Sequence, residues 1–476
     1  MSELPPEMTA PTPEPAEPER PAPPPVVDEE LVENVEVLVH DGQEGMVLNL
    51  VTDLHPADLG SLLSHLPVEA AQALFGWLPE DRAGAVLPEL ESARRADLLQ
   101  GVPAHEIVGL LDHLDTDDAV DVLADVDEDV AEHVLPHLED AAEVEHLMSY
   151  GEDTAGGLME TDYVAVPATA TVAEATEAVR ACAEKVDPVY VVYVLDEDER
   201  LVGIVPLTRL ILAHAGTPIT AVMEADFTAV EPDLDQEEVA RIMQRYDLVA
   251  LPVVSAGGRF LGRITIDDIV DVIREEAEED FQRSAGLSGE EEISASVFAI
   301  SRGRIVWLLV GLVGASFSGL VIRGFEGALE AATVLAMFIP IVMAMAGNAG
   351  IQSSAIAVQG LASGDLWTSD VVPRLGKELA VALLNGAILA VVLGAIVVGM
   401  SYTGVLGDAD ALHLAATAGL SLLIVIVIAT VLGATVPLLL HRVGIDPALA
   451  MGPFITVSND ILGLTVFFLI ATLLYL

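Results

Sequence analysis

Apolar residues recur every twelve positions in the first third of the chain. In each unit, a pair of apolar residues follows eight and nine positions after the first one. Pro, Asp or Glu usually comes directly after the first position, so each unit predicts a tight turn and a helix of about two turns. Helices that short are unstable alone, and we expect residues 54–137 to stack into an α-superhelix with one shared core. The first positions are Leu54, Leu66, Leu78, Leu90, Val102, Leu114, Val126 and Leu138.

A second repeat with a longer period follows. METDYVAV at 159–166 is similar to MEADFTAV at 223–230, and RLVGIVPLTRL at 200–210 is similar to RFLGRITIDDI at 259–269. Each copy predicts a strand, a helix, an apolar strand, a turn, a further strand and a helix. This order resembles a tandem pair of CBS domains, in which two copies pack face to face.

The resemblance to CBS domains implies a candidate nucleotide site. CBS pairs commonly bind ATP or another adenine nucleotide, with a Thr or Ser and an Asp three residues later touching the ribose. The second copy has Thr265 and Asp268, whereas the first has Pro206 and Arg209 at these positions. Only half of such a site is therefore present.

The last part of the chain is almost continuously apolar and predicts five membrane spans. They lie near 304–322, 331–361, 376–400, 412–440 and 448–475. Pro340 and Pro437 fall within the second and fourth spans, which we expect to be kinked or partly outside the bilayer. Ahead of them, residues 267–287 predict a helix with an apolar stripe that leads from the second repeat to the membrane. Its stripe consists of Ile269, Val272, Ile273 and Ala277.

Charge is divided in the same way as hydrophobicity. The 476 residues carry a net charge of −55, and residues 1–300, with 66 acidic and 14 basic residues, account for −52 of it. The long apolar part of the chain excludes a wholly soluble protein. The acidic part excludes a nucleic-acid binder, because a negatively charged surface repels phosphate. The single Cys excludes disulfides within the chain and Cys-cluster metal sites. Two readings of the acidity stay open, a solvated surface adapted to concentrated salt and carboxylate clusters that bind divalent cations.

Topology follows from the distribution of basic residues. Residues 1–27 are rich in Pro and predict a disordered tail, and they contain no signal-peptide pattern, so we expect a cytoplasmic N-terminus. Five spans then place the C-terminus outside a plasma membrane that the chain crosses several times. Five basic residues fall inside, and only Arg323 falls outside, as the positive-inside rule requires. The five are Arg302, Arg304, Arg374, Lys377 and Arg442.

Asp460 is the main candidate for ion chemistry. It lies in PFITVSNDILGLTVFF, near the middle of the last span, with Ser458 and Asn459 beside it. A carboxylate in hydrocarbon costs about 2.5–3.5 kcal/mol on insertion scales, and no Lys or Arg in a comparable apolar stretch can pair with it. This favours a cation path. The alternative is a protonated, hydrogen-bonded Asp that serves packing.

A second polar group lies in the second span, in AGNAGIQSS at 346–354. Asn348 and Gln352 are four residues apart and fall on one helix face, where their amide oxygens suit a pore lining. The small residues around them equally suit close helix packing. No GxSxG, Walker or HExxH pattern is present, so we expect neither an enzyme nor transport driven by ATP hydrolysis.

Together these features resemble the MgtE family of magnesium channels and transporters. Four stretches carry the resemblance, YGEDTAGGLM, GFEGALE, PIVMAMAGNAGIQSS and IDPALAMGPFITVSND. They occur in the family's order, and the resemblance extends over nearly everything from about residue 30 onward. It implies a Mg²⁺-selective homodimer in a lipid membrane, with the pore at the subunit interface and closure when cytosolic Mg²⁺ is high.

The resemblance also implies roles for single residues. The family's pore aspartate falls on Asp460, with Asn348, Gln352, Gly452 and Asn459 as further pore-lining candidates. Some members carry Asn where this chain has Gly452. The regulatory metal-binding positions fall on Asp117, Asp121, Asp235, Glu237, Asp247, Asp268, Asp271, Glu276, Glu279 and Asp280.

The expected architecture is a multidomain α plus α/β fold. Its parts are a tail at 1–27, an acidic α-superhelical domain at 28–150, CBS copies at 151–220 and 221–272, a connecting helix at 273–300 and a five-helix membrane domain at 301–476. One alternative is a non-transporting membrane sensor, in which the CBS pair binds nucleotide or divalent cation and the spans are only an anchor. A CBS-linked anion channel is disfavoured, because such channels usually have many more spans and place the CBS pair after them.

Overall fold

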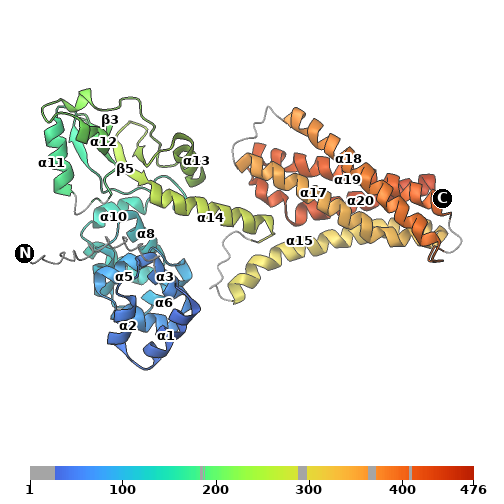
Figure 1. The fold of residues 1–476 in the computed structure, drawn as a ribbon, viewed down its shortest axis with the longest axis horizontal. Coiled ribbons are helices and arrows are strands. Elements are labelled where there is room, and N and C mark those ends of the chain that lie inside the picture. The colour runs from blue at the N-terminus through green and yellow to red at the C-terminus, as the bar shows by residue number, and fades with distance from the viewer. Residues whose placement is uncertain (1–26, 183–185, 187, 288–296, 363–370, 407–409) are drawn as a thin grey trace, which may run out of the picture. The chain divides into compact units, whose positions relative to one another are not determined.

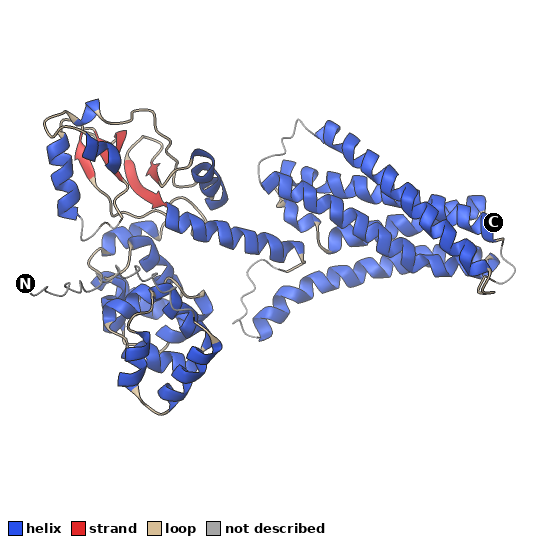
Figure 2. Ribbon diagram, viewed as in Figure 1, coloured by secondary structure: helices blue, strands red, loops and turns tan. Residues whose placement is uncertain are grey.

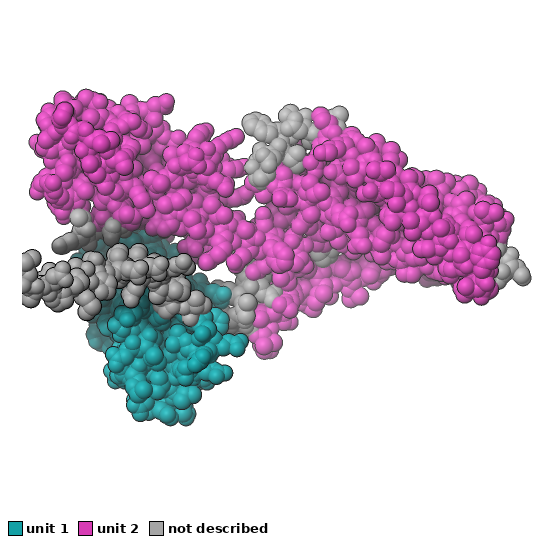
Figure 3. Space-filling view, viewed as in Figure 1, with its two compact units in different colours: residues 1–147 teal, residues 148–476 magenta. Residues whose placement is uncertain are grey.

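The fold was analysed in a computed structural model, which describes residues 27–182, 186, 188–287, 297–362, 371–406 and 410–476. All but the last residue of the predicted tail lies outside these ranges. The chain divides into two compact units, Met1–Leu147 and Met148–Leu476 (Figure 3). Each is described by itself.

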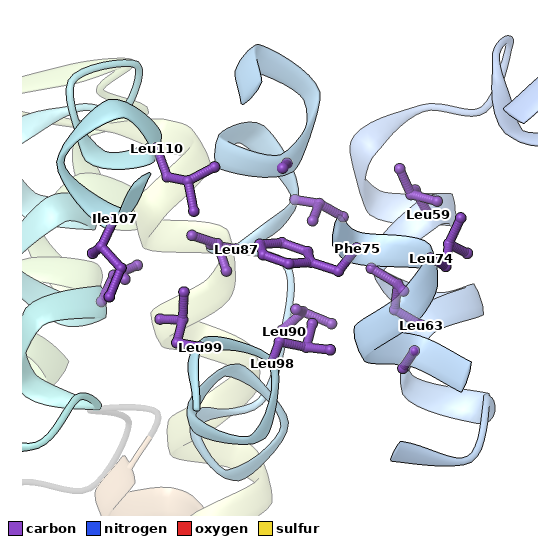
Figure 4. Packing of buried hydrophobic residues seen from close by; sticks show 14 of the residues in the cluster. Leu59, Leu63, Leu74, Phe75, Leu87, Leu90, Leu98, Leu99, Ile107 and Leu110 are labelled. Carbon is purple, nitrogen blue, oxygen red and sulfur yellow. The ribbon is translucent and has the colours of Figure 1, made fainter. Parts of the chain in front are cut away.

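The first unit consists of short helices, and α3 to α9 follow the twelve-residue repeat, one helix in each unit of the repeat (Figure 1). This confirms the predicted helical domain. Side chains from successive helices, among them Leu63, Phe75, Leu87 and Leu99, meet in one core (Figure 4). The helices are α1 Glu29–His40, α2 Glu44–Val51, α3 Pro56–His65, α4 Val68–Trp77, α5 Glu80–Val86, α6 Ser92–Leu99, α7 Ala104–Leu111, α8 Thr116–Ala124, α9 Glu128–Val134, η1 Leu135–His137 and α10 Ala141–Leu147.

Polar contacts repeat with the same period as the core. Arg82 donates from Nη2 to the carbonyl oxygen of Leu54 at 2.7 Å, and twelve residues later Arg94 donates from Nη2 to that of Leu66 at 3.0 Å. Leu66 directly follows α3, and Leu54 lies three residues beyond the end of α2, so both carbonyls stand past a helix end, where backbone oxygens lack intrahelical donors. These arginines therefore supply hydrogen-bond donors to the backbone carbonyl oxygens of successive turns, and they join each helix to one further along the stack.

The second unit begins with two small sheets, which correspond to the two repeat copies (Figure 2). In the first copy, β1 pairs parallel with β2 and β2 pairs antiparallel with β3; in the second, β4 pairs antiparallel with β5. The first strand expected in the second copy is reduced to a single bridge between Val230 and Val253. The elements are β1 Ala165–Pro167, α11 Val172–Cys182, β2 Val191–Leu195, β3 Leu201–Pro206, α12 Leu207–Leu212, η2 Ile219–Ala221, α13 Gln236–Tyr246, β4 Ala250–Val254, β5 Phe260–Thr265 and α14 Ile266–Ser284.

A buried ion pair joins the two copies. Arg263 Nη2 on β5 lies 2.6 Å from Glu160 Oε2, in the segment that leads into the first copy. Beside them, the ring of Phe260 lies 4.4 Å from that of Tyr193, measured between centroids. Because removing one partner of a buried pair strands the other charge, this contact fixes the copies together.

The last CBS helix and the connecting helix are one element. Helix α14 begins at Ile266, inside the second copy, and ends at Ser284, whereas the sequence placed the connecting helix at 273–300. Residues 288–296 of that range lie outside the described residues. Of the predicted apolar stripe, Ile269 and Val272 are buried, but Ile273 is exposed, so the stripe divides between a packed and an open face.

In the described part of the chain, five helices are long and apolar enough to cross a membrane, as expected. They are α15 Val297–Gly324, α17 Ile339–Ala362, α18 Val371–Ser401, α19 Ala411–Arg442 and α20 Pro453–Leu474, with α16 Glu326–Ala331, η3 Thr333–Phe338 and η5 Pro447–Ala450 between them. The second span divides into η3 and α17, and Pro340 is the second residue of α17, where a missing N–H costs nothing. Pro437 lies inside α19. Helices α17, α18 and α20 all pack against α19.

Candidate ion path and acidic sensor

Asp460 is the eighth residue of α20 and lies at the centre of the apolar segment Pro447–Leu474. Its side chain is half-buried. Among the described residues, no Lys, Arg or His forms an ion pair with it. Within the described residues, Asp460 is therefore a carboxylate without an ion-pair partner in an apolar helix, and such a group is a functional candidate by default.

Asn459, a further pore-lining candidate, makes packing contacts in the single chain. Its side chain is only 1 % exposed, and Nδ2 donates to the carbonyl oxygen of Ala346 on α17 at 3.3 Å. A Cβ added to Gly350 would collide with this amide, and a Cβ added to Gly433 on α19 would collide with the carbonyl oxygen of Gly350. Asn459 is therefore a packing residue where α17, α19 and α20 cross, and the small residues at 346–354 allow that crossing.

The two amides predicted on α17 line a cavity to which Asp460 does not contribute. Asn348 and Gln352 are exposed and line a cavity of about 440 Å³ between α17, α18 and α19, and Asp460 is not among its lining residues. Gly452, the residue before α20, is partly exposed, and a Cβ there would lie 3.4 Å from the Cα of Gly286, just beyond α14.

Four of the predicted regulatory carboxylates gather where α13 packs against α14. Asp235 caps α13 by accepting from the backbone N of Glu237 at 3.0 Å, and Gln236 Nε2 donates to Glu276 Oε1 at 2.7 Å. Burial raises the pKa of Glu237 above its usual range, and the negative charges of Glu276, Asp280 and Asp235 raise it further against the opposing effect of Arg241. This acidic cluster is a place where a cation would be favoured.

The cluster continues towards the membrane domain. Burial raises the pKa of Asp280, and the charges of Asp446 and Glu276 add to the shift. Burial also raises the pKa of Glu279, partly offset by Arg283. Arg283 pairs both with Glu279 and with Asp446, whose Oδ2 lies 2.8 Å from Nη1.

Asp446 was missed in the sequence analysis. It accepts from the backbone N of Ala448 and so caps η5, directly ahead of α20. The available signal was an Asp-Pro pair at the start of IDPALAMGPFITVSND, because Asp before Pro marks the start of a helix.

The other predicted regulatory residues stand outside this cluster. Asp247 is exposed at the end of α13 with a left-handed backbone, and Asp271 is exposed and pairs with Arg274 at 3.5 Å. Asp117 and Asp121 lie one turn apart on α8, in the first unit. In the described ranges, no group of three or more His, Cys, Asp or Glu side chains has the arrangement of a metal site. The single chain thus presents open carboxylate clusters rather than a closed ligand set.

The candidate nucleotide residues are engaged in local contacts. Thr265 and Asp268 form the capping box of α14, with Thr265 Oγ1 donating to Asp268 Oδ2 at 3.0 Å. In the first copy, Arg209 lies 2.6 Å from Glu224. A nucleotide would have to displace these contacts.

Comparison with known proteins covers the whole architecture. Residues 54–153 match the MgtE intracellular N domain, 155–216 and 219–275 match CBS domains, and 339–470 match a divalent cation transporter domain named MgtE. The magnesium transporter MgtE of Thermus thermophilus is 34% identical over 456 residues, which cover 94% of this chain and 99% of the relative. That of Bacillus subtilis is 31% identical over 446 residues, with 93% and 97% covered.

The chain belongs to the MgtE family of magnesium transporters. Two solved structures are also similar. The cytosolic domain of the Mg²⁺ channel MgtE in complex with ATP is 35% identical with a TM-score of 0.48, covering 51% of this chain and 99% of that one. The soluble part of a magnesium transporter is 30% identical with a TM-score of 0.47, covering 52% and 99%.

Membership of the MgtE family establishes the general function of the chain. The chain is a multi-pass membrane protein with an intracellular N domain, and it is a transporter homologue rather than an enzyme. The candidate residues of α8, α13 and α14 can now be read in the context of Mg²⁺ transport.

Proposed function

We propose that this MgtE-family chain conducts Mg²⁺ across the cell membrane along a path lined by Asp460. The observation that carries the proposal is the half-buried carboxylate of Asp460 in an apolar helix, without an ion-pair partner in the described residues. Mg²⁺ gives up its water reluctantly, so a carboxylate that hydrogen-bonds the hydrated ion suits its passage better than a tight cage.

A homodimer would complete the path. One carboxylate does not surround a hydrated ion, whereas two copies related by a twofold axis would place an Asp460 on each side of it. With an intracellular N domain and five spans, the chain would end outside a plasma membrane, and Lys377 and Arg442 would lie inside.

Cytosolic Mg²⁺ would close the path through the acidic cluster of α13 and α14. Without the ion, the carboxylates of Glu237, Glu276 and Asp280 repel one another, and the charge of Glu276 contributes to the raised pKa values of Glu237 and Asp280. A divalent ion shared among them would remove that repulsion and favour the docked state, in which α13 and α14 are packed together and the path is closed. This is a population shift driven by differential binding. The contact of Arg283 with Asp446 would carry the change to the segment before α20.

An adenine nucleotide such as ATP is a further hypothesis, limited to the second CBS copy. The hydroxyl of Thr265 would exchange its bond with Asp268 for one to the ribose. The alternative function, a sensor that does not transport, would use the same cluster but would not need Asp460.

Flux of Mg²⁺ into proteoliposomes tests the transport proposal. Asp460→Asn keeps the size of the side chain and removes its charge, so we expect a dimer that elutes normally and a loss of most Mg²⁺ flux. The matched control is Asp410→Asn, at the carboxylate that caps α19, which should conduct like the wild type. Normal flux through purified Asp460→Asn would refute the proposed path, and no flux through the wild type would favour the sensor.

A further inference from the structure

The membrane domain contains a polar cavity that does not include Asp460. Helices α17 and α18 each pack along α19, and a cavity of about 440 Å³ lies between them. Six of its lining residues are polar, namely Asn348, Gln352, Ser353, Glu378, Asn385 and Thr430. The other seven lining residues are apolar, and the polar ones supply the partners that buried water requires.

Glu378 is the charged residue of this cavity, and it is only 8 % exposed. Each carboxylate oxygen has a different partner. Ser353 Oγ on α17 donates to Oε2 at 2.9 Å, and Arg374 Nη2, one turn earlier on α18, lies 3.3 Å from Oε1. A carboxylate within an apolar span is retained mainly for a functional reason.

The pair with Arg374 is loosely built. A strong Arg–carboxylate pair is bidentate, with two parallel hydrogen bonds, whereas here one nitrogen makes a single long contact and Arg374 Nε is buried without a partner. Arg374 is partly exposed and lies at the end of α18 that faces the cytoplasm if the N domain is inside. Long basic side chains near helix ends readily turn towards the interface.

The other polar groups suit a hydrated cation. Asn348, Gln352 and Asn385 are exposed and offer amide oxygens, which accept hydrogen bonds from bound water. Ser353 holds the buried carboxylate in place from the neighbouring helix. A divalent ion with its water shell therefore finds one negative charge and several acceptors, as hydrated Mg²⁺ requires.

We propose that this cavity is a second intramembrane site for a hydrated divalent cation, in which the ion replaces Arg374 as the partner of Glu378. The choice of cation rests on the proposed Mg²⁺ transport, but the site does not use Asp460. Arg374 acts as an internal competitor, because it occupies the carboxylate when the ion is absent. The site would hold ions near the inner side of the membrane domain.

Cysteine accessibility tests the site without measuring flux. Cys182 is the sole cysteine, so Cys182→Ser with Ile388→Cys places one reporter thiol at an apolar lining residue of the cavity, outside the proposed acceptors. In full-length protein in liposomes, a cationic methanethiosulfonate reagent added from the cytoplasmic side should label the thiol, and Mg²⁺ alone should slow the labelling. Glu378→Gln should raise the half-protecting Mg²⁺ concentration about tenfold or more, as expected for loss of a charged ligand. Arg374→Gln should lower it.

The outcomes separate this site from gating and from the proposed pore. Absence of labelling would show that lipid or a second copy fills the cavity, and equal protection in Glu378→Gln and the parent would show that Mg²⁺ acts through gating. Either result overturns the proposal. If Glu378→Gln does not fold, Ser353→Ala, which leaves the carboxylate but removes its hydrogen bond, should still weaken protection, and an unchanged value counts against the site. Adding Asp460→Asn should leave protection intact, so failure of the pore assignment would not be mistaken for failure of this site.

Discussion

Arg283 Nη1 on the last turn of α14 lies 2.8 Å from Oδ2 of Asp446, the residue that caps η5 directly ahead of α20. The same guanidinium pairs with Glu279, four residues earlier on α14. One basic side chain thus joins the helix that carries the acidic cluster to the segment that leads to Asp460. Within the second unit, this contact is the candidate route from the proposed sensor to the proposed ion path.

The first prediction concerns this contact. Arg283→Gln removes the positive charge between Glu279 and Asp446, so the two carboxylates repel and the docked state weakens. We expect severalfold higher flux at low internal Mg²⁺, while high Mg²⁺ still closes the path because the ion can replace the guanidinium. Flux is measured against internal Mg²⁺ in proteoliposomes. Arg274→Gln is the matched control, since Arg274 lies on the same helix and is exposed, and equal effects of the two changes would contradict the prediction.

The second prediction concerns the cluster itself. Replacing Glu276, Glu279 and Asp280 together by their amides should shift the inhibition curve to higher Mg²⁺ and leave a path that conducts when the wild type is closed. Ion contacts near the protein surface are individually weak, so the triple change should exceed any single one. Maximal flux should persist, because Asp460 is intact. An inhibition curve that overlays that of the wild type would place the sensor elsewhere.

The third prediction is a pH dependence. Glu237, Glu279 and Asp280 have raised pKa values in the folded chain, so in the absence of Mg²⁺ their contribution to stability is fully present below their ordinary pKa values and is lost as the pH rises through the raised ones. Mg²⁺ binds the ionised groups. The test uses a fragment of residues 28–285, which contains the helical domain, the two CBS copies and α14. Mg²⁺ should raise its melting temperature clearly at about pH 7.5 but little at about pH 4.5.

The measurement is a thermal melt by circular dichroism at constant ionic strength. Glu237→Gln with Asp280→Asn should flatten the pH dependence of the Mg²⁺ effect. A surface adapted only to concentrated salt makes a different forecast, because monovalent salt at matched ionic strength would then stabilise the fragment as well as Mg²⁺ does.

The sequence allowed prediction wherever a period fixed the structure. The twelve-residue spacing of positions such as Leu66 and Leu78 predicted one helix in each unit of the repeat, and the apolar runs predicted the spans to within a few residues. Side-chain direction was harder. Helix α20 is apolar on all sides, so no amphipathic face distinguished the buried Asn459 from the half-buried Asp460. Asp446 was overlooked because its neighbours Glu279 and Arg283 lie more than 160 positions earlier, and only folding brings them together.

The last prediction concerns the crossing behind Asp460. A Cβ at Gly350 would collide with Asn459 Nδ2 and lie 2.9 Å from Ile455 Cγ2, both on α20. Gly350→Ala should therefore displace α20 from α17, and overpacking of this kind costs about 1–3 kcal/mol. We expect a lower melting temperature together with a marked loss of Mg²⁺ flux, because the displaced helix carries Asp460.

Gly347→Ala is the matched control: Gly347 is buried on the same helix, but a Cβ there meets nothing within 4 Å. Flux and thermal stability of both variants are compared in purified protein. Equal flux and equal stability of the two variants would show that the contact of Gly350 with Asn459 does not position Asp460. A selective effect of Gly350→Ala would show that the crossing of α17 and α20 holds Asp460 in the position that ion flux requires.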